Sequence, residues 1–509
     1  MHGAVYVRAA LACLAATCAF PLGCGKRGDT PVDPGPDVQI VGESARVRLE
    51  DPVPARAPFL SGGKVELVAA RGERLGIQVL HRSAGPVALT IAAPGVRVRG
   101  YAVESFKVTR PSTELYGGGR EGTFAEALSP ADAPRTSPAY LEIEVAASAE
   151  PGVVTGELAV GDRRLPVTLT IVPLVLARPA MAVWAYEDPR ELAWGNGAAP
   201  DAPSDREQAC AAMFAGYGVT LMPDLKPGWW PGRRPPAGTN LKDLPVVIPA
   251  DPALVGDAVK AWIAATKDSG VVPFAIPIDE PRTPEARAKV VELAKAVRAA
   301  GGGPTTFRYA VTDQPRPEYG DLVDLYISLE VPRSHAGTQW TYNGAPPRAG
   351  SMVLDAQSPG TRTWGWIAHR YQIPVWYVWD ALYWHDRYNH KQEPPRPLDV
   401  RVDPTSFDDG EDHGNLDGVL SVRHPTTGAC QASLRLAALY RGLQDRQLLA
   451  QAAACDAAKT EAIAARMVPS ALGDAPAKGA PSWSTDDSAW ELARRELLQV
   501  ASCAVAPAK

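Results

Sequence analysis

Two adjacent acids, Asp279 and Glu280, follow a short apolar run that begins at Gly270, and Pro281 comes directly after them. An apolar run of this length, bounded by turn residues, is typical of a strand that is covered on both faces. In parallel barrels the carboxyl ends of the strands carry the catalytic side chains. We therefore expect the two carboxylates to meet at such an end, where one ionised and one protonated carboxyl would supply a base and an acid at neutral pH.

A purely structural explanation of the same residues competes with this one. Acids suit the first turn of a helix and proline suits its first position, so Asp-Glu-Pro can simply end a strand and begin a helix. Adjacent side chains on a regular strand also point to opposite faces. Pro281, however, should keep Glu280 extended as the pleat ends, so that both carboxylates reach one site from different directions.

The rest of the chain supplies elements that could position this pair. Turn residues and alternating apolar residues predict a β-sandwich over 38–178. Strands then alternate with helix-length amphipathic segments, which predicts a (β/α)8 barrel of the TIM type over 179–455 and a helical tail over 456–509. Six or seven barrel strands can be counted, at 181–186, 219–222, 270–281, 306–311, 322–329, 351–354 and 374–379. Helices are expected at 204–217, 252–269, 284–300, 429–454 and 485–503.

Aromatic and acidic residues accompany the later barrel strands. Tyrosine, tryptophan and aspartate side chains at one mouth suit a carbohydrate, because sugar faces stack on aromatic rings and sugar hydroxyls bond to carboxylates. Core packing is the alternative for any single tryptophan, whereas Asp380 is hard to bury without a purpose. The expected glycan contacts are Tyr309, Trp340, Tyr342, Trp376, Trp379, Asp380 and Trp384, with Trp340 and Tyr342 in a loop over 337–344.

The N-terminus resembles an export signal. Arg8 precedes an apolar stretch over 9–22 that is too short for a stable transmembrane helix. The segment ends in Pro-Leu-Gly-Cys, which is similar to a bacterial lipobox and predicts cleavage of residues 1–23 with lipidation of Cys24. Residues 24–37 are expected to form a flexible tether. Simple secretion without the lipid is the alternative. We expect the protein to contact a membrane only through this N-terminal lipid anchor.

Composition excludes several classes of function. The formal net charge of the 509 residues is -5 and no long basic run occurs, which argues against nucleic-acid binding. Neither a nucleophile elbow, a phosphate loop nor a metal-spaced cysteine or histidine motif is present, and we expect no metal or organic cofactor. Cysteines in an exported protein can form disulfides, and neighbouring first and last barrel helices would bring Cys210 near Cys430.

Several stretches, taken in order, resemble glycoside hydrolase family 123 and its exported bacterial relatives. Ile278 to Pro281 is similar to the family's Asp-Glu pair. The other similar stretches are Ala70–Glu73 with Gln78, Pro151–Gly156, Arg362 with Trp364 or Trp366, Trp384, Ser433–Arg435 and Arg441–Asp445. The sequence departs from the family at Leu416–Gly418, at Arg423–Pro425 and after Asp445.

The resemblance implies a retaining, exo-acting β-N-acetylgalactosaminidase that uses substrate assistance, an exception to the scheme with two catalytic carboxylates. Asp279 would orient the acetamido group, and Glu280 would protonate the leaving oxygen and then activate water. Two other functions stay open. One is a carbohydrate-binding envelope protein without catalysis, and the other is a glycosidase for a sugar that lacks the acetamido group, with Asp313 or Asp380 as the nucleophile.

Overall fold

The computed structural model describes residues 36–55, 57–176, 181–193, 201–335, 338–388 and 396–504. The predicted signal, Cys24 and all but the last two residues of the predicted tether lie outside the described residues. Within them, no helix combines the length and the apolar composition that a bilayer span needs.

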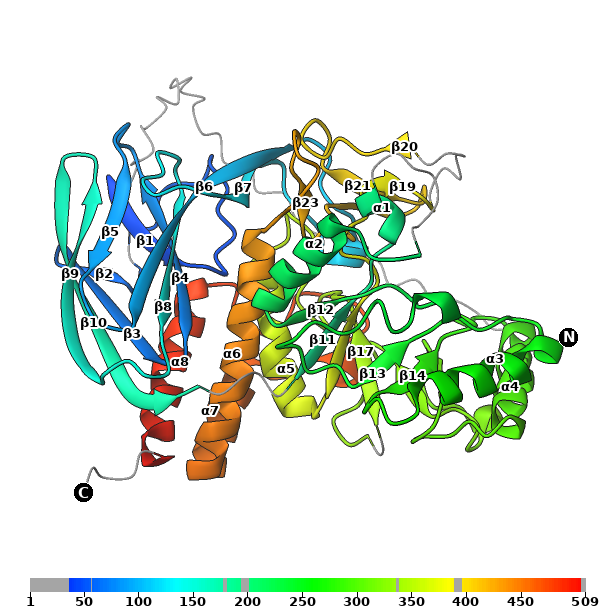
Figure 1. Ribbon diagram of the computed structural model, residues 1–509. Helices are drawn as coiled ribbons and strands as arrows, with labels where there is room; N and C mark the ends of the chain where they lie inside the picture. The colour runs from blue at the N-terminus through cyan, green and yellow to red at the C-terminus, as the bar shows by residue number, and fades with distance from the viewer. Residues whose placement is uncertain are drawn as a thin grey trace, which may run out of the picture. The chain divides into compact units, whose positions relative to one another are not determined.

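Ten strands between Val38 and Val175 form two five-stranded sheets (Figure 1). On β3, Val65 and Leu67 are buried while Lys64 and Glu66 between them are exposed, as alternation predicts. Buried side chains from both sheets join one hydrophobic cluster. The first sheet has the order β1 (Val38–Gly42), β4 (Arg74–His81), β8 (Ala139–Val145), β6 (Val96–Val108), β7 (Gly122–Pro130). The second has the order β2 (Leu60–Ser61), β3 (Lys64–Arg71), β10 (Arg163–Val175), β9 (Gly152–Val160), β5 (Val87–Ile91).

The third large sheet has eight strands, and every neighbouring pair in it is parallel. Its order is β12 (Val219–Leu221), β11 (Ala182–Ala185), β18 (Val375–Val378), β17 (Gln339–Tyr342), β16 (Leu325–Ile327), β15 (Arg308–Val311), β14 (Val272–Ala275), β13 (Asp243–Pro245). A parallel bridge between Leu225 and Val246 joins the segments that follow the two edge strands. The sheet is a TIM-like half-barrel, in the range where the sequence predicts a barrel.

Three helices of this region begin and end close to their predicted positions, namely α2 (Asp205–Gly216), α3 (Pro252–Thr266) and α4 (Pro284–Ala299). The helix α5 (Thr363–Tyr371) and the short α1 (Pro189–Ala193) were not predicted. Ser204 caps α2 by accepting a hydrogen bond from the Glu207 amide, and Thr283 caps α4 by accepting one from Ala286. These caps are local signals, which is why the sequence locates them well.

Two strand predictions are wrong. Residues 351–354 are buried but form no strand, whereas β17 lies at Gln339–Tyr342, where a loop is expected. A four-residue strand shows too little alternation to be recognised from sequence. In addition, β14 ends at Ala275, so Asp279 and Glu280 lie in the loop between β14 and α4 rather than at the end of the strand itself.

Helix α6 (Leu434–Cys455) lies between the N-terminal sheets and the eight-stranded sheet (Figure 1). Helices α7 (Ala457–Met467) and α8 (Asp487–Val500) follow it. A disulfide joins Cys210 to Cys430, which confirms that pairing, and a second joins Cys455 to Cys503. Short strands complete the fold, namely β19 (His385–Asp386), β20 (Arg396–Pro397), β21 (Thr405–Asp408), β22 (His413–Asn415), β23 (Val422–Arg423) and β24 (Cys430–Gln431).

A buried ion network ties α6 and α8 to the N-terminal sheets. Arg441 on α6 contacts Glu491 on α8 at 2.8 Å and Glu73, in the turn between β3 and β4, at 2.5 Å. Arg362, just before α5, contacts the other oxygen of Glu491 at 2.5 Å and Asp445 on α6 at 2.8 Å. No side chain in these pairs is more than 4% exposed. The network, which water does not reach, therefore links the C-terminal helix α8 to the rest of the fold.

Candidate active site

Asp279 and Glu280 lie on the carboxyl-end face of the eight-stranded sheet, by which we mean the side on which its parallel strands end. The Asp279 residue is exposed and Glu280 is half-buried. Glu280 has a φ of +40°, so its backbone is left-handed rather than extended, which corrects the prediction from Pro281. Such a conformation is strained for a residue with a Cβ and persists only when its surroundings hold it.

Thr312, directly after β15, holds the two acids together. Its hydroxyl accepts a hydrogen bond from the Glu280 amide at 2.6 Å and donates one to Asp279 Oδ1, also at 2.6 Å. Thr312 is itself only 7% exposed, so this bridge is fixed by the packing of the sheet. The acids are thus linked through one hydroxyl rather than bonded to each other.

Tyr342, at the end of β17, and Arg282 contact the Glu280 carboxylate. The Tyr342 hydroxyl donates to Oε1 at 2.9 Å, and the Arg282 guanidinium pairs with Oε2. The Arg282 side chain is 82% exposed, so this ion pair is weak and a ligand could replace it. Tyr342 is the one expected glycan contact that lies directly against the acid pair.

The environment of Asp279 raises its pKa. Its side chain reaches solvent, yet the protein surrounds it closely enough that partial desolvation raises its pKa. The bond from Thr312 opposes this rise because the hydroxyl donates to the carboxylate, whereas the charge of Glu280 adds to it. The balance leaves the pKa of Asp279 above its ordinary value.

Replacing Thr312 with valine tests this balance. The isosteric side chain cannot donate to Asp279, so the pKa of Asp279 should rise further. If the ionised carboxylate is the active form, the acidic limb of a pH profile should then move to higher pH. Loss of one hydrogen bond to a charged group predicts a fall of about tenfold in kcat/KM on the acidic side. Thr312→Ser keeps the hydroxyl and should restore the profile, and an unshifted profile in Thr312→Val would contradict this role.

Four of the expected aromatic glycan contacts are buried, which corrects those predictions. Trp340 packs edge-on against Phe274 inside the half-barrel, and Trp376 stacks on Trp364 of α5 at 4.9 Å. The four residues are Tyr309, Trp340, Trp376 and Trp384, and none is more than 2% exposed. Side chains packed into a core cannot stack on a sugar, so here the core-packing alternative holds.

Trp379 remains accessible at the same face as the acid pair. It is half-buried, and its indole N–H donates to Asp417 Oδ1 at 3.2 Å. Its ring lies 5.3 Å from that of Tyr383 and 6.0 Å from that of Tyr388, measured between centroids. Tyr388 is 50% exposed, so Trp379 and Tyr388 form an aromatic wall that solvent reaches.

Asp380 is fully buried and bound by Arg387, which also contacts Glu191 at 2.8 Å and Asp188 at 3.4 Å. Burial raises the pKa of Asp380 to about 7 although Arg387 opposes the rise. The other proposed nucleophile, Asp313, is likewise engaged, by Arg316 and by the Tyr319 hydroxyl. Neither carboxylate is free to attack a sugar in this arrangement.

Several residues of this face were not predicted from the sequence. Thr312 is an isolated threonine, and Asp224 follows the three-residue strand β12 by way of Met222 and Pro223. An acid soon after a short buried strand is a recognisable pattern, and it could have found Asp224. The tyrosines at 186, 377 and 388 also reach this face, and they are too common a residue type to have stood out.

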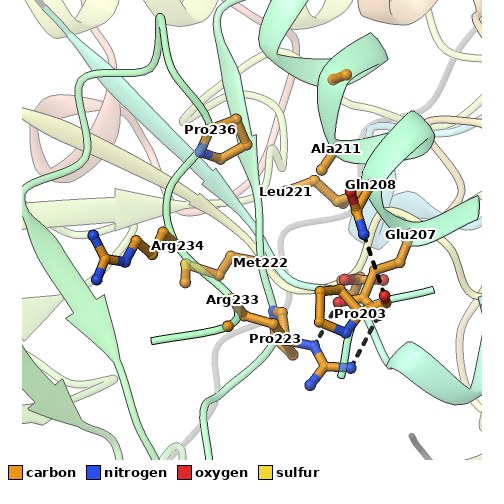
Figure 2. A pocket seen from close by; sticks show the side chains of 13 residues that line it. Pro203, Glu207, Gln208, Ala211, Leu221, Met222, Pro223, Arg233, Arg234 and Pro236 are labelled. Atoms are coloured by element: carbon orange, nitrogen blue, oxygen red, sulfur yellow. Dashed lines mark hydrogen bonds and ion pairs between the residues drawn. The ribbon is translucent and has the colours of Figure 1, made fainter. Parts of the chain in front are cut away.

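A cavity of about 200 Å³ lies beside the carboxyl ends of β11 and β12 (Figure 2). Arg233 pairs with Glu207 at 2.5 Å on its wall, and Gln208 of α2 also lines it. Glu187 lines it too, is 1% exposed, and has a pKa well above its ordinary value because of burial and the nearby Glu207. Neither Asp279 nor Glu280 lines this cavity, so it is separate from the acid pair.

Across the described ranges, no group of three or more His, Cys, Asp or Glu side chains is arranged to hold a metal ion. The acidic stretch at 408–413 is bonded to a neighbouring segment of the chain. Asp408 pairs with Arg110 at 2.5 Å, and His413 bonds to the Pro111 carbonyl.

No protein-family model matches the sequence, and no curated protein matches it. Solved structures do match. The chain is similar to a family 123 glycoside hydrolase from Clostridium perfringens, described in connection with glycolipid glycan hydrolysis. The TM-score is 0.63 and the identity 11%, over 92% of this chain and 98% of that one.

Two further structures match weakly and carry no argument. One is an Ig-like-domain-containing GH10 xylanase from termite gut, with a TM-score of 0.27 and 8% identity over 75% of this chain and 99% of that one. The other is a glycosyl hydrolase family 2 member from Bacteroides cellulosilyticus, with a TM-score of 0.25 and 11% identity over 67% and 46%. At 11% identity the match to the family 123 glycoside hydrolase shows a shared fold alone, over nearly the whole length of this chain.

Proposed function

We propose that the protein is a retaining, exo-acting glycoside hydrolase for β-linked 2-acetamido sugars such as N-acetylgalactosamine. The observation that carries this proposal is the pair of accessible acids, Asp279 and Glu280, bridged by Thr312 at the carboxyl ends of a TIM-like sheet. The shared fold with a family 123 glycoside hydrolase supports the same reaction class. One fold can carry many unrelated activities, and it is the acid pair that indicates this reaction.

In the proposed mechanism the substrate supplies its own nucleophile. The acetamido oxygen attacks the anomeric carbon while Glu280 gives a proton to the leaving glycosidic oxygen. Asp279 accepts a hydrogen bond from the acetamido N–H and stabilises the positive charge that develops on that group. Glu280 then takes a proton from the water that opens the cyclic intermediate. Two attacks at the same carbon retain its configuration.

A glycosidase that does not use the acetamido group is less well supported. It needs a second carboxylate within reach of the anomeric carbon. Asp313 and Asp380, the two residues considered for this role, are bound by Arg316 and Arg387. If a second carboxylate were the nucleophile, Asp380→Asn would remove turnover. Under substrate assistance, Asp279→Asn should lower turnover more than Asp380→Asn does.

Hydrolysis of aryl 2-acetamido-2-deoxy-β-galactoside by the full chain tests the proposed function. Turnover is expected on this substrate, and no turnover on the matching β-galactoside with a 2-hydroxyl group. Proton NMR of the first-formed sugar should show the β anomer. Equal rates on both substrates would argue against substrate assistance. Glycan binding without any turnover would favour the carbohydrate-binding alternative.

We also propose that the chain is exported and anchored through a lipid on Cys24, and that the two N-terminal sheets act as a β-sandwich that supports the half-barrel. The lipobox-like sequence supports the first idea, and the hydrophobic cluster common to both sheets supports the second. The mass of the N-terminal peptide of the mature protein, with or without the acyl chains, tests the anchor.

A further inference from the structure

Three residues on the carboxyl-end face, Tyr186, Asp224 and Tyr377, lie on or shortly after neighbouring strands. Tyr186 follows β11, Asp224 follows β12, and Tyr377 lies in β18. These strands are adjacent in the order β12, β11, β18, and their parallel pairing brings their carboxyl ends together. The Tyr377 ring is fixed from the side, because it stacks on Trp184 with centroids 4.3 Å apart.

The side-chain oxygens of these three residues make no hydrogen bond within the part of the chain that the structure describes, and each residue is half-buried. Other acids nearby are bonded to the protein, such as Asp279 to Thr312 and Asp380 to Arg387. Half-buried polar groups without protein partners are expected to bind water or a ligand. We call Tyr186, Asp224 and Tyr377 the recognition group.

Electrostatic effects connect the recognition group to the acid pair. Burial and then the nearby Asp279 carboxylate raise the pKa of Asp224 to about 7. After burial, Asp224 is in turn the largest cause of the raised pKa of both Tyr186 and Tyr377. A ligand that contacts Asp279 is therefore within reach of the recognition group.

We propose that the recognition group binds the hydroxyls of the terminal sugar, and that Asp224 restricts the substrate to sugars without an acidic substituent. This inference rests on the proposed function and deepens it. A carboxyl group can accept from two adjacent hydroxyls or donate one proton of its own, and tyrosine hydroxyls both donate and accept. Sugar hydroxyls match this set of donors and acceptors, and each would satisfy an oxygen that the protein leaves unpaired.

The charges around the recognition group explain the restriction. Above about pH 7, where Asp224 is ionised, a sulfate or carboxylate on the sugar would meet its charge and that of Asp279 at close range, and like charges in a partly desolvated site repel strongly. The buried guanidinium of Arg387 cannot offset this repulsion, because Asp188, Glu191 and Asp380 already surround it.

Binding measurements with free sugars test the proposal independently of turnover. Titration calorimetry at pH 8, where Asp224 is ionised, would compare N-acetylgalactosamine with its 6-O-sulfated form for the wild type, Asp224→Asn and a control. The wild type should bind the neutral sugar at least tenfold more tightly than the sulfated one. Asp224→Asn should weaken binding of the neutral sugar by about tenfold, about 1.4 kcal/mol, and reduce the preference over the sulfated sugar. Asp257→Asn removes one exposed charge from α3 and should change neither affinity.

The outcomes separate the inference from the proposed function. Tight binding of the neutral sugar with an unchanged neutral-to-sulfated ratio in Asp224→Asn would overturn the inference and leave the function standing. Absence of both binding and turnover in the wild type would refute the function and the inference with it. If Asp224→Asn does not fold, as judged by circular dichroism, Asp224→Glu replaces it. That variant keeps the charge, so it should bind the neutral sugar more weakly and still reject the sulfated one.

Discussion

Replacing Glu280 with glutamine should lower kcat for the aryl 2-acetamido-2-deoxy-β-galactoside by about 10²- to 10⁴-fold, the usual contribution of a positioned general acid and base. The amide cannot give its proton to the leaving oxygen or take one from water. It can still accept a hydrogen bond from Tyr342, which now donates to Glu280 Oε1 at 2.9 Å. KM should therefore change little, and circular dichroism should match that of the wild type.

The control for this variant is Glu285→Gln, an exposed acid in the first turn of α4 and close in sequence to Glu280. It makes the same chemical change outside the acid pair and should leave kcat within a factor of two. A Glu280→Gln enzyme with nearly full kcat would mean that another group transfers the proton. An aryl substrate with a more acidic leaving group should show a smaller loss, because it needs less help from the acid.

Replacing Glu491 with glutamine should destabilise the protein by about 3–5 kcal/mol, the typical effect of removing one partner of a buried ion pair. Glu491 bonds to Arg362 at 2.5 Å and to Arg441 at 2.8 Å, and all three side chains are at most 4% exposed. The neutral amide would leave both guanidiniums with one fewer counter-charge where water cannot reach them. The midpoint of urea unfolding, followed by tryptophan fluorescence at pH 7.5, measures this loss.

The pH dependence of this effect follows from the pKa of Glu491. Burial alone would raise it, but Arg362 and Arg441 lower the pKa of Glu491 well below its ordinary value. A lowered folded-state pKa gives stability that is present above the unfolded value, near 4, and is lost as pH falls through the folded value. The deficit of Glu491→Gln should therefore be constant from pH 6 to 8 and shrink only below about pH 4.

Glu496→Gln is the matched control on the same helix. Glu496 pairs with Arg466 at 2.7 Å, but the two side chains are 44% and 54% exposed, so its loss should cost less than about 1 kcal/mol. Equal effects of the two substitutions would show that the buried network adds nothing beyond a surface pair. The comparison keeps helix propensity nearly constant, since both changes replace glutamate with glutamine in α8.

The acid pair could be located from sequence because its signals are local. The apolar run, the two acids and Pro281 are contiguous, and the cap at Thr283 places the start of α4. The parallel sheet was also predictable, because strand and helix patterns repeat along the chain. The strands themselves were not all found, since β17 and β13 are only four and three residues long.

Whether an aromatic side chain faces the site or the core could not be predicted. Trp376 and Tyr377 are adjacent on β18, so they point to opposite sides, yet either assignment fits the sequence. The structure buries Trp376 against Trp364 and leaves the Tyr377 hydroxyl at the carboxyl-end face. Rules based on residue type favoured tryptophan at these positions and so missed Tyr186, Tyr377 and Tyr388.

The sequence by itself determined the order and approximate bounds of most elements and the position of two adjacent acids, because each depends on residues that are neighbours along the chain. Only the tertiary structure decided what surrounds those acids. Thr312 is 33 residues from Asp279, and Tyr342 is 62 residues from Glu280. Such partners are selected by the register and closure of the eight-stranded sheet, and the free energy that fixes this arrangement comes from the packing of the whole fold rather than from any one segment.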